Sequence, residues 1–203
     1  MAAAASRDAA MRARIAPALL LVAGLCGCAP DPGSLLTVKT VLDRGLEARS
    51  GEDIMADTQL FIRVNRVMAG LGVTSAATEI YERRLLITGQ VADKETCDRF
   101  RRSAHRLHAR VVYWHVLCPG EDGAPPKTEL DWVEVNTLRA KANARLAATG
   151  GVADLNFRVA ADAEGTLYLL GRARSPEEKQ RALASAAEGD GVGKVVDYVV
   201  VRP

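Results

Sequence analysis

Large aromatic side chains are scarce in this sequence, which has two tryptophans, four tyrosines and three phenylalanines in 203 residues. Hydrophobic residues nevertheless make up 48% of the chain, which is enough apolar material for packed cores. Few large side chains are available to fill those cores. We therefore expect small cores that are rich in alanine and valine.

The usual signatures of catalysis are also missing. No serine or cysteine stands in a nucleophile-elbow context, and no pair of carboxylates stands out. The glycines at 189, 191 and 193 precede a strand pattern, whereas a phosphate-binding glycine loop opens a helix. We therefore expect no enzyme, no cofactor and no small-molecule substrate.

Histidine is equally rare, and all three histidines lie between positions 105 and 115. With Cys97 and Cys118 they give the spacing Cys-x7-His-x2-His-x6-His-x2-Cys, which matches no zinc signature. The segment also carries arginines at 99, 101, 102, 106 and 110. This pattern favours a solvated or anion-facing basic helix over a metal site.

The longest apolar segment near the N-terminus is too short to cross a bilayer. A helix that spans a bilayer needs about 20 apolar residues. It lies in MRARIAPALLLVAGLCGC, residues 11–28, after two arginines and before small residues, as in an export signal. The ending Leu25-Cys26-Gly27-Cys28 resembles a bacterial lipobox. That resemblance implies cleavage after residue 27 and a diacylglyceryl group on Cys28. The alternative is an uncleaved helix that buries both cysteines.

An excess of one charge sign is absent once this signal is removed. Residues 1–27 hold three arginines and one aspartate, so the remaining chain has 27 − 3 = 24 basic and 25 − 1 = 24 acidic residues. Its formal net charge is zero. A nucleic-acid partner is therefore not expected, because binding to phosphate backbones needs a basic surplus.

Two cysteines lie inside the predicted folded region, Cys97 and Cys118. In an exported chain a disulfide between them is the natural hypothesis. It would close a loop of about 20 residues and stabilise the fold by about 3 kcal/mol. The alternative is a pair of buried free thiols.

An internal repeat organises the rest of the chain. LLITGQVADKE at 85–95 returns as LYLLGRARSPE at 167–177. The linker CPGEDGAPPKTELD, rich in proline, glycine and acidic residues, lies between the copies. We expect a signal at 1–27, an acylated tether at 28–55, a first domain at 56–118, a linker at 119–130 and a second domain at 131–203.

Each copy has the same succession of patterns. A helical pattern at 57–71 or 131–146 starts at an aspartate, Asp57 or Asp131, which is a good N-cap residue. A β-hairpin follows, then a helix that starts at Asp93 or at a capping box formed by Ser175 and Glu178, then a β-branched strand. This order predicts an α+β fold: two three-stranded mixed sheets, each with two helices on one face.

A glycine interrupts the returning strand of each hairpin, at Gly89 and Gly171. Glycine weakens a strand interior, so its usual meaning there is a bulge or the close approach of another segment. We expect another part of the backbone to lie against both positions.

The doubled unit, with LLITGQV and LYLLGRA and the ending GVGKVVDYVVV, resembles two BON domains. Preceded by a lipobox, the chain is similar to the dual-BON outer-membrane lipoproteins of Gram-negative bacteria. The first copy departs from the pattern, because HARVVYWHV lacks the Gly-Val before its last strand. The resemblance implies a non-enzymatic, lipid-anchored protein on the periplasmic face of the outer membrane that supports envelope integrity.

The resemblance also implies that the first helix of the second domain binds anionic phospholipid. The matching segment is DWVEVNTLRAKANAR. Trp132 suits the boundary between headgroups and acyl chains, and Arg139, Lys141 and Arg145 suit lipid phosphates. The alternative is that Trp132 packs into its own domain and the cations form a solvated face.

A second function stays open beside this one. The basic helix at 95–110 equally fits a docking surface for another envelope protein. The chain would then be a protein–protein adaptor, with no lipid contact beyond its acyl anchor.

Overall fold

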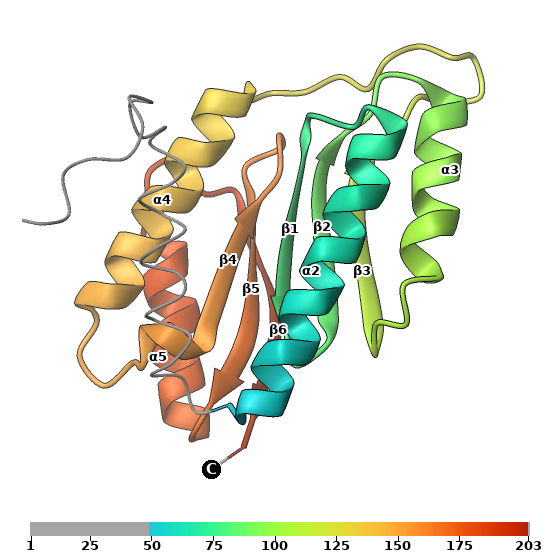
Figure 1. Cartoon of the computed structure of the whole chain (residues 1–203). Coiled ribbons are helices and arrows are strands. Elements are labelled where there is room, and N and C mark those ends of the chain that lie inside the picture. Colours follow the sequence, from blue (N-terminus) through green and yellow to red (C-terminus); the bar gives the residue numbers. More distant parts are fainter. Residues whose placement is uncertain (1–48, 203) are drawn as a thin grey trace, which may run out of the picture. The chain divides into compact units, whose positions relative to one another are not determined.

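The computed structural model describes residues 49–202, all of which lie in the second of two units into which the chain divides, residues 40–203. These residues form an α+β fold with two three-stranded sheets and four α-helices (Figure 1). The signal, Cys28 and most of the tether lie outside the described residues.

The first half contains α2 (Gly51–Leu71), β1 (Ala76–Tyr81), β2 (Arg84–Gln90), α3 (Lys94–His105) and β3 (Val111–Leu117). The second half contains α4 (Trp132–Ala148), the short 3-10 helix η1 (Asp154–Asn156), β4 (Phe157–Ala161), β5 (Thr166–Ala173), α5 (Pro176–Ala187) and β6 (Lys194–Val201). In each half the hairpin strands are antiparallel and the last strand lies parallel to the second. The predicted mixed sheets are confirmed.

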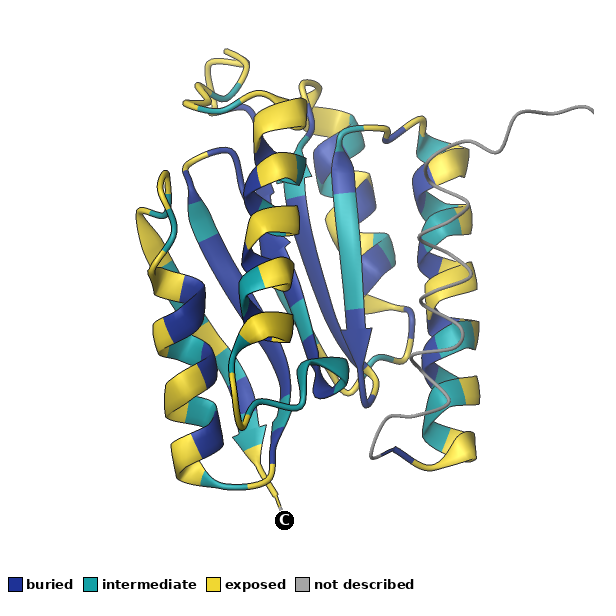
Figure 2. Ribbon diagram, turned by 90° about the vertical axis from the view of Figure 1, so that its left-hand side faces the viewer, coloured by how far each residue is buried: buried dark blue, intermediate teal, exposed yellow. Residues whose placement is uncertain are grey.

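Both helices of each half cover one face of its sheet. Leu60 and Val64 of α2 and Phe100 of α3 pack with Leu85 and Ile87 of β2 in the first core. The second core is built in the same way, and Figure 2 shows the buried stripe of each helix turned to its sheet. As expected, that core is rich in small residues: Ala142, Ala161, Ala163, Ala173, Ala182 and Ala186.

The other faces of the two sheets pack against each other. Leu86 of β2 and Leu170 of β5 are fully buried there with Tyr81. The helical layers therefore lie on opposite outer sides of this unit, with α2 and α3 on one side and α4 and α5 on the other (Figure 1). The internal repeat predicts two tandem domains, and this core shared between their sheets lies outside that prediction.

The start of α2 corrects one prediction. The N-cap is Ser50, whose hydroxyl accepts from the Asp53 amide, so the helix begins at Gly51, six residues before the predicted helical pattern at 57–71. Asp57 is a buried residue inside α2, and its carboxylate accepts from the amides of Glu82 and Arg83. It thus serves the β1–β2 turn instead of capping its own helix.

The other three caps follow the sequence closely. Asp131 forms a complete capping box with Glu134, and Asp93 accepts from the Thr96 amide. Ser175 caps α5 with Pro176 at the first helical position. The Glu178 carboxylate, however, accepts from the Arg174 and Ala153 amides. These two hydrogen bonds replace the bond to the Ser175 amide that the predicted capping box would have.

At Gly89 and Gly171, the predicted close approach of another backbone segment is confirmed. A Cβ on Gly89 would lie 2.6 Å from the Ala76 Cα and against the Ser75 carbonyl. A Cβ on Gly171 would lie 2.9 Å from the Phe157 Cα and against the Asn156 carbonyl. In each hairpin the first strand begins directly over this glycine.

Candidate functional site

The N-terminal end of α4 exposes two large apolar side chains. Trp132 is 42% exposed and Val133 is 70% exposed, at the first two positions of the helix. The capping box between Asp131 and Glu134 holds this end in helical form. A rigid backbone therefore presents an indole and a valine to solvent.

Farther along α4, the exposed side carries alanines, two polar residues and one cation. Ala140, Lys141 and Ala144 are exposed, whereas Val135, Leu138, Ala142 and Leu146 form the buried stripe. We call Trp132, Val133, Ala140, Lys141 and Ala144 the α4 outer face. Glu134, Thr137 and Asn143 are exposed on the same helix, so the exposed side of α4 is mixed, with one positive and one negative charge.

The two arginines predicted beside these residues bind within the protein. Arg139 lies 3.5 Å from the Glu79 carboxylate of β1, with part of its side chain still exposed. Arg145 donates to the carbonyls of Ser185 and Ala186, at the C-terminal end of α5. A cation is favourable there because a helix C-terminus carries partial negative charge. Of the four predicted lipid contacts, Trp132 and Lys141 therefore lie on the α4 outer face, and Arg139 and Arg145 flank it.

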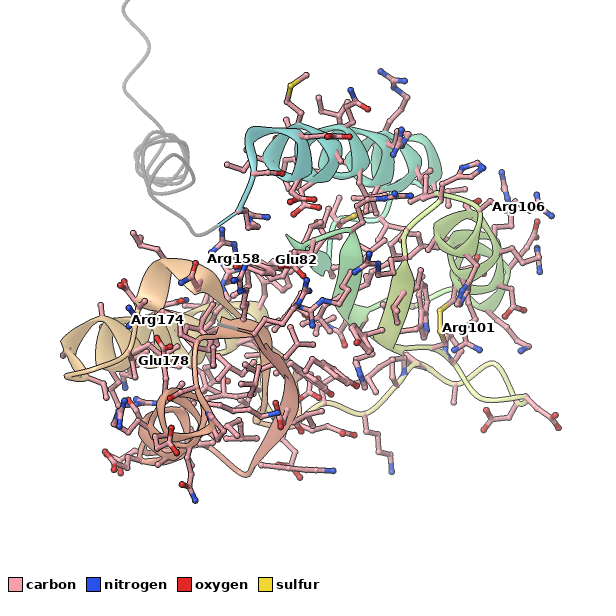
Figure 3. The ribbon with its side chains drawn as sticks, turned by 90° about the horizontal axis from the view of Figure 1, so that it is seen from below. Glu82, Arg101, Arg106, Arg158, Arg174 and Glu178 are labelled. Carbon is pink, nitrogen blue, oxygen red and sulfur yellow. A yellow bond between two sulfur atoms is a disulfide. The ribbon has the colours of Figure 1, made fainter. Side chains whose placement is uncertain are left out.

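A second charged surface lies on α3. Arg99, Arg101, Arg102 and Arg106 are all exposed, and none forms an ion pair with another residue in 49–202. Figure 3 shows Arg101 and Arg106 projecting from this helix. We call these four residues the α3 arginine surface. It is the basic helix that the sequence predicted.

Cys97 at the start of α3 is joined by a disulfide to Cys118, which follows β3, and their Cα atoms are 5.9 Å apart. The bridge ties the helix to the end of the strand that it leads into. It therefore fixes the α3 arginine surface relative to β3.

The contact between the sheets contains polar groups that the sequence analysis missed. Arg84 is 4% exposed and donates to the carbonyls of Tyr198 (2.7 Å) and Gly171 (2.8 Å). His115 Nε2 lies 2.7 Å from the Tyr198 hydroxyl, and the Tyr113 ring stacks on the Tyr198 ring with centroids 3.8 Å apart. These contacts join β2 and β3 to the second sheet.

Burial in the contact between the sheets shifts the pKa of one histidine and of one tyrosine. Desolvation lowers the pKa of His115, Asp162 opposes that shift, and Lys194 adds to it. Desolvation raises the pKa of Tyr168, whose hydroxyl donates to Asp162 Oδ2 at 2.6 Å. At neutral pH both side chains are therefore uncharged, as a buried contact requires.

Acid is expected to weaken the fold through His115. Its folded pKa lies below the ordinary value of 6.5, so below that pH the unfolded chain binds more protons than the folded chain. Stability should fall as the pH drops below 6.5, until the folded pKa has been passed. Urea unfolding at a series of pH values should show a shallower acid loss for His115→Gln. An equal slope for both proteins would contradict this prediction.

No helix in 49–202 is long and apolar enough to cross a membrane. Within the same range, no three histidine, cysteine, aspartate or glutamate side chains gather as a group that could hold a metal ion.

One family model matches part of the chain. The family model of the BON domain matches residues 134–203, from the first turn of α4 to the end of the chain. A curated protein of Anaplasma centrale, described as an uncharacterized protein in the gshII 5′ region, is 27% identical over 153 residues. That alignment covers 72% of this chain and 95% of the relative.

Two solved structures of CdsD, a structural protein of the type III secretion system of Chlamydia trachomatis, also align with this chain. Both are 12% identical to this chain. Each alignment covers 71% of this chain, and the two alignments cover 92% and 98% of the CdsD chains. Their TM-scores are 0.30 and 0.29, which are too low to support a functional inference.

Proposed function

We propose, from the BON domain at residues 134–203, that this chain is a lipid-anchored envelope protein that binds anionic phospholipid through the α4 outer face. BON domains in general bind phospholipids. The anchor would be a diacylglyceryl group on Cys28, and the location the periplasmic face of the outer membrane. The role would be support of outer-membrane integrity, without catalysis.

The first half is proposed to be a second BON domain. Residues 51–117 repeat the element order of the second half, with the same strand order and the same antiparallel and parallel pairings. The glycine of the returning strand has the same close backbone neighbour in both halves. The tandem arrangement thus rests on topology and on a shared local constraint.

The exposed pair of Trp132 and Val133 is the observation that carries the lipid proposal. An indole prefers the region between headgroups and acyl chains, and a valine at the same helix end adds apolar area that water would otherwise cover. Lys141, exposed farther along α4, suits a lipid phosphate and contributes about 1 kcal/mol near an anionic surface. Arg139 can add a second cation, because its ion pair with Glu79 is long and partly exposed.

A vesicle assay tests this proposal. The chain from Ala29 onward, without an acyl group, should co-sediment with phosphatidylglycerol vesicles, and Trp132→Ser should weaken the binding roughly tenfold through lost apolar contact. Lys141→Glu should reduce the preference for anionic over neutral vesicles. Ile62→Ser on α2 is a matched control, because Ile62 is an apolar residue with 50% exposure on the opposite helical layer.

The outcome of the control decides the interpretation. If Ile62→Ser weakens vesicle binding as much as Trp132→Ser does, the α4 outer face is not the contact. If the unacylated chain binds no vesicles at all, the membrane contact is confined to the anchor. A protein–protein adaptor, for which the α3 arginine surface is the supporting observation, would then be the better function.

A further inference from the structure

The strand β3 is an open edge of the first sheet. The strand order is β1-β2-β3, so β3 pairs with β2 on one side only. Of its seven residues only Val116 is buried, and Val111 is 38% exposed. An open edge presents unpaired amides and carbonyls, which makes it a template for pairing with another strand.

Natural edge strands are usually protected by charges, prolines or bulges. Three of the four edge strands in the described residues carry charge: β1 has Glu79, β4 has Arg158, and β6 has Lys194 and Asp197. The sequence of β3, VVYWHVL, has no charged residue and no proline. Among these four edge strands, β3 is thus the one with neither a charged residue nor a proline.

The direction of the β3 peptide groups follows from one bond at the end of the strand. The Leu117 carbonyl accepts from the Val91 amide, so the peptide group of Leu117 faces β2. Peptide groups alternate along a strand, which turns those of Val112 and Trp114 towards the open edge. These two amides are the donors that an added strand would meet.

Arginines lie at two places along this edge. The Arg101 guanidinium lies 5.2 Å from the centre of the Trp114 ring, which places this one member of the α3 arginine surface beside β3. At the start of the strand, the Arg110 amide donates to the Arg83 carbonyl, and the Arg83 guanidinium donates to the His108 carbonyl. Between positions 99 and 110 the sequence has five arginines and no acidic residue.

We infer that β3 accepts an extended acidic segment of a partner protein as a fourth strand of the first sheet. The edge amides would supply main-chain hydrogen bonds, and the flanking arginines would pair with glutamate or aspartate side chains. Main-chain pairing provides affinity in such strand addition, and side chains provide specificity. Arginine suits this role because its planar fork binds carboxylates through two parallel hydrogen bonds.

A second copy of this chain fits the edge less well. Pairing of two β3 strands would bring two α3 arginine surfaces together, and like charges at close range are repulsive. The site is also independent of the proposed lipid contact, because α3 and α4 belong to opposite helical layers. A chain held at a membrane through α4 would keep the β3 edge accessible.

The experiment uses the full chain and a fluorescein-labelled peptide of alternating glutamate and valine. Fluorescence anisotropy should show binding that is at least about tenfold tighter than for the matched lysine–valine peptide, because charge-assisted contacts are involved. Hydrogen exchange should slow at Val112 and Trp114 when the acidic peptide is added. An N-methylated acidic peptide keeps its charges but cannot donate along a strand, so it should not bind.

Two variants and a control locate the contact. Arg101→Glu should weaken binding about tenfold, by the loss of one charge-assisted contact. Val112→Pro should abolish binding by removing an edge amide, with circular dichroism as the check on folding. Arg63→Glu on α2 is the matched control, because Arg63 is also an exposed helical arginine of the first half. Vesicle binding through α4 should be unchanged in all three variants.

Several results would overturn the inference. Equal binding of the N-methylated peptide would show a purely electrostatic contact that does not use the strand. Displacement of the peptide by phosphatidylglycerol vesicles, abolished by Arg101→Glu, would make the partner a lipid surface. A dimer in sedimentation that Val112→Pro converts to monomer would make the partner a second copy of this chain.

Discussion

Gly171→Val is expected to destabilise the second half by about 3 kcal/mol or more, among the largest effects of a single substitution in this chain. Its Cβ would overlap the Asn156 carbonyl and the Phe157 Cα. Both are backbone atoms at the start of β4, and Phe157 is paired directly with Gly171 in the sheet. The strain therefore cannot be relieved by a side-chain rotation. Urea unfolding followed by circular dichroism measures the loss.

Gly89→Val should behave in the same way, because Ala76 is the paired residue there. Gly70→Ala is the matched control: nothing lies within 4 Å of its added Cβ, and it sits in α2. That substitution should raise stability by up to about 1 kcal/mol, since alanine favours helix over glycine. If Gly171→Val unfolds at the urea concentration of the unaltered chain, the close approach in the structure is wrong.

The parts of the fold that the sequence predicted well are those set by local patterns. Apolar spacing of three and four residues places Leu60, Val64 and Met68 on one buried stripe, and the same spacing holds in α4. Caps such as Asp93 and Asp131 act within three residues of themselves. Such features need no knowledge of distant segments, so the repeat, the element order and the sheet topology follow from the sequence.

The contact between the two sheets was missed although the sequence carries a signal for it. A strand buried on one face alternates between apolar and polar residues, whereas a strand buried on both faces is continuously apolar. LLI in β2 and LYLL in β5 are continuous runs. Leu85 and Ile87 face the helices, and Leu86 faces the other sheet. A strict application of the rule would have predicted a second layer.

Of the residues predicted to contact lipid, two arginines bind within the protein and Lys141 does not, for a reason that sequence spacing alone does not give. The helical pattern fixes which stripe of α4 is buried, but not which neighbour occupies each flank. Arg139 lies on the flank that meets Glu79 of β1, and Arg145 lies on the flank that meets α5. Lys141 is exposed. The sequence identifies each cation, but the partner of that cation depends on tertiary packing.

Asp57→Ala is expected to destabilise the chain by about 3–5 kcal/mol, because it removes one partner of a buried ion pair. Asp57 is 4% exposed, and its carboxylate forms a salt bridge with Arg49. The same carboxylate accepts from the amides of Glu82 (2.8 Å) and Arg83 (2.6 Å). Urea unfolding again gives the free energy, and Asp57→Asn, which keeps one acceptor oxygen, should lose less.

The β1–β2 turn explains why these hydrogen bonds matter. Glu82 and Arg83 have φ angles of 51° and 60°, and this left-handed backbone is costly for residues other than glycine and asparagine. Glu82→Asn with Arg83→Gly should therefore recover part of the loss in an Asp57→Ala background. Asp53→Ala in the same helix is the control, with a cost below about 1 kcal/mol. Equal costs for the two aspartates would mean that the carboxylate of Asp57 does not hold the turn.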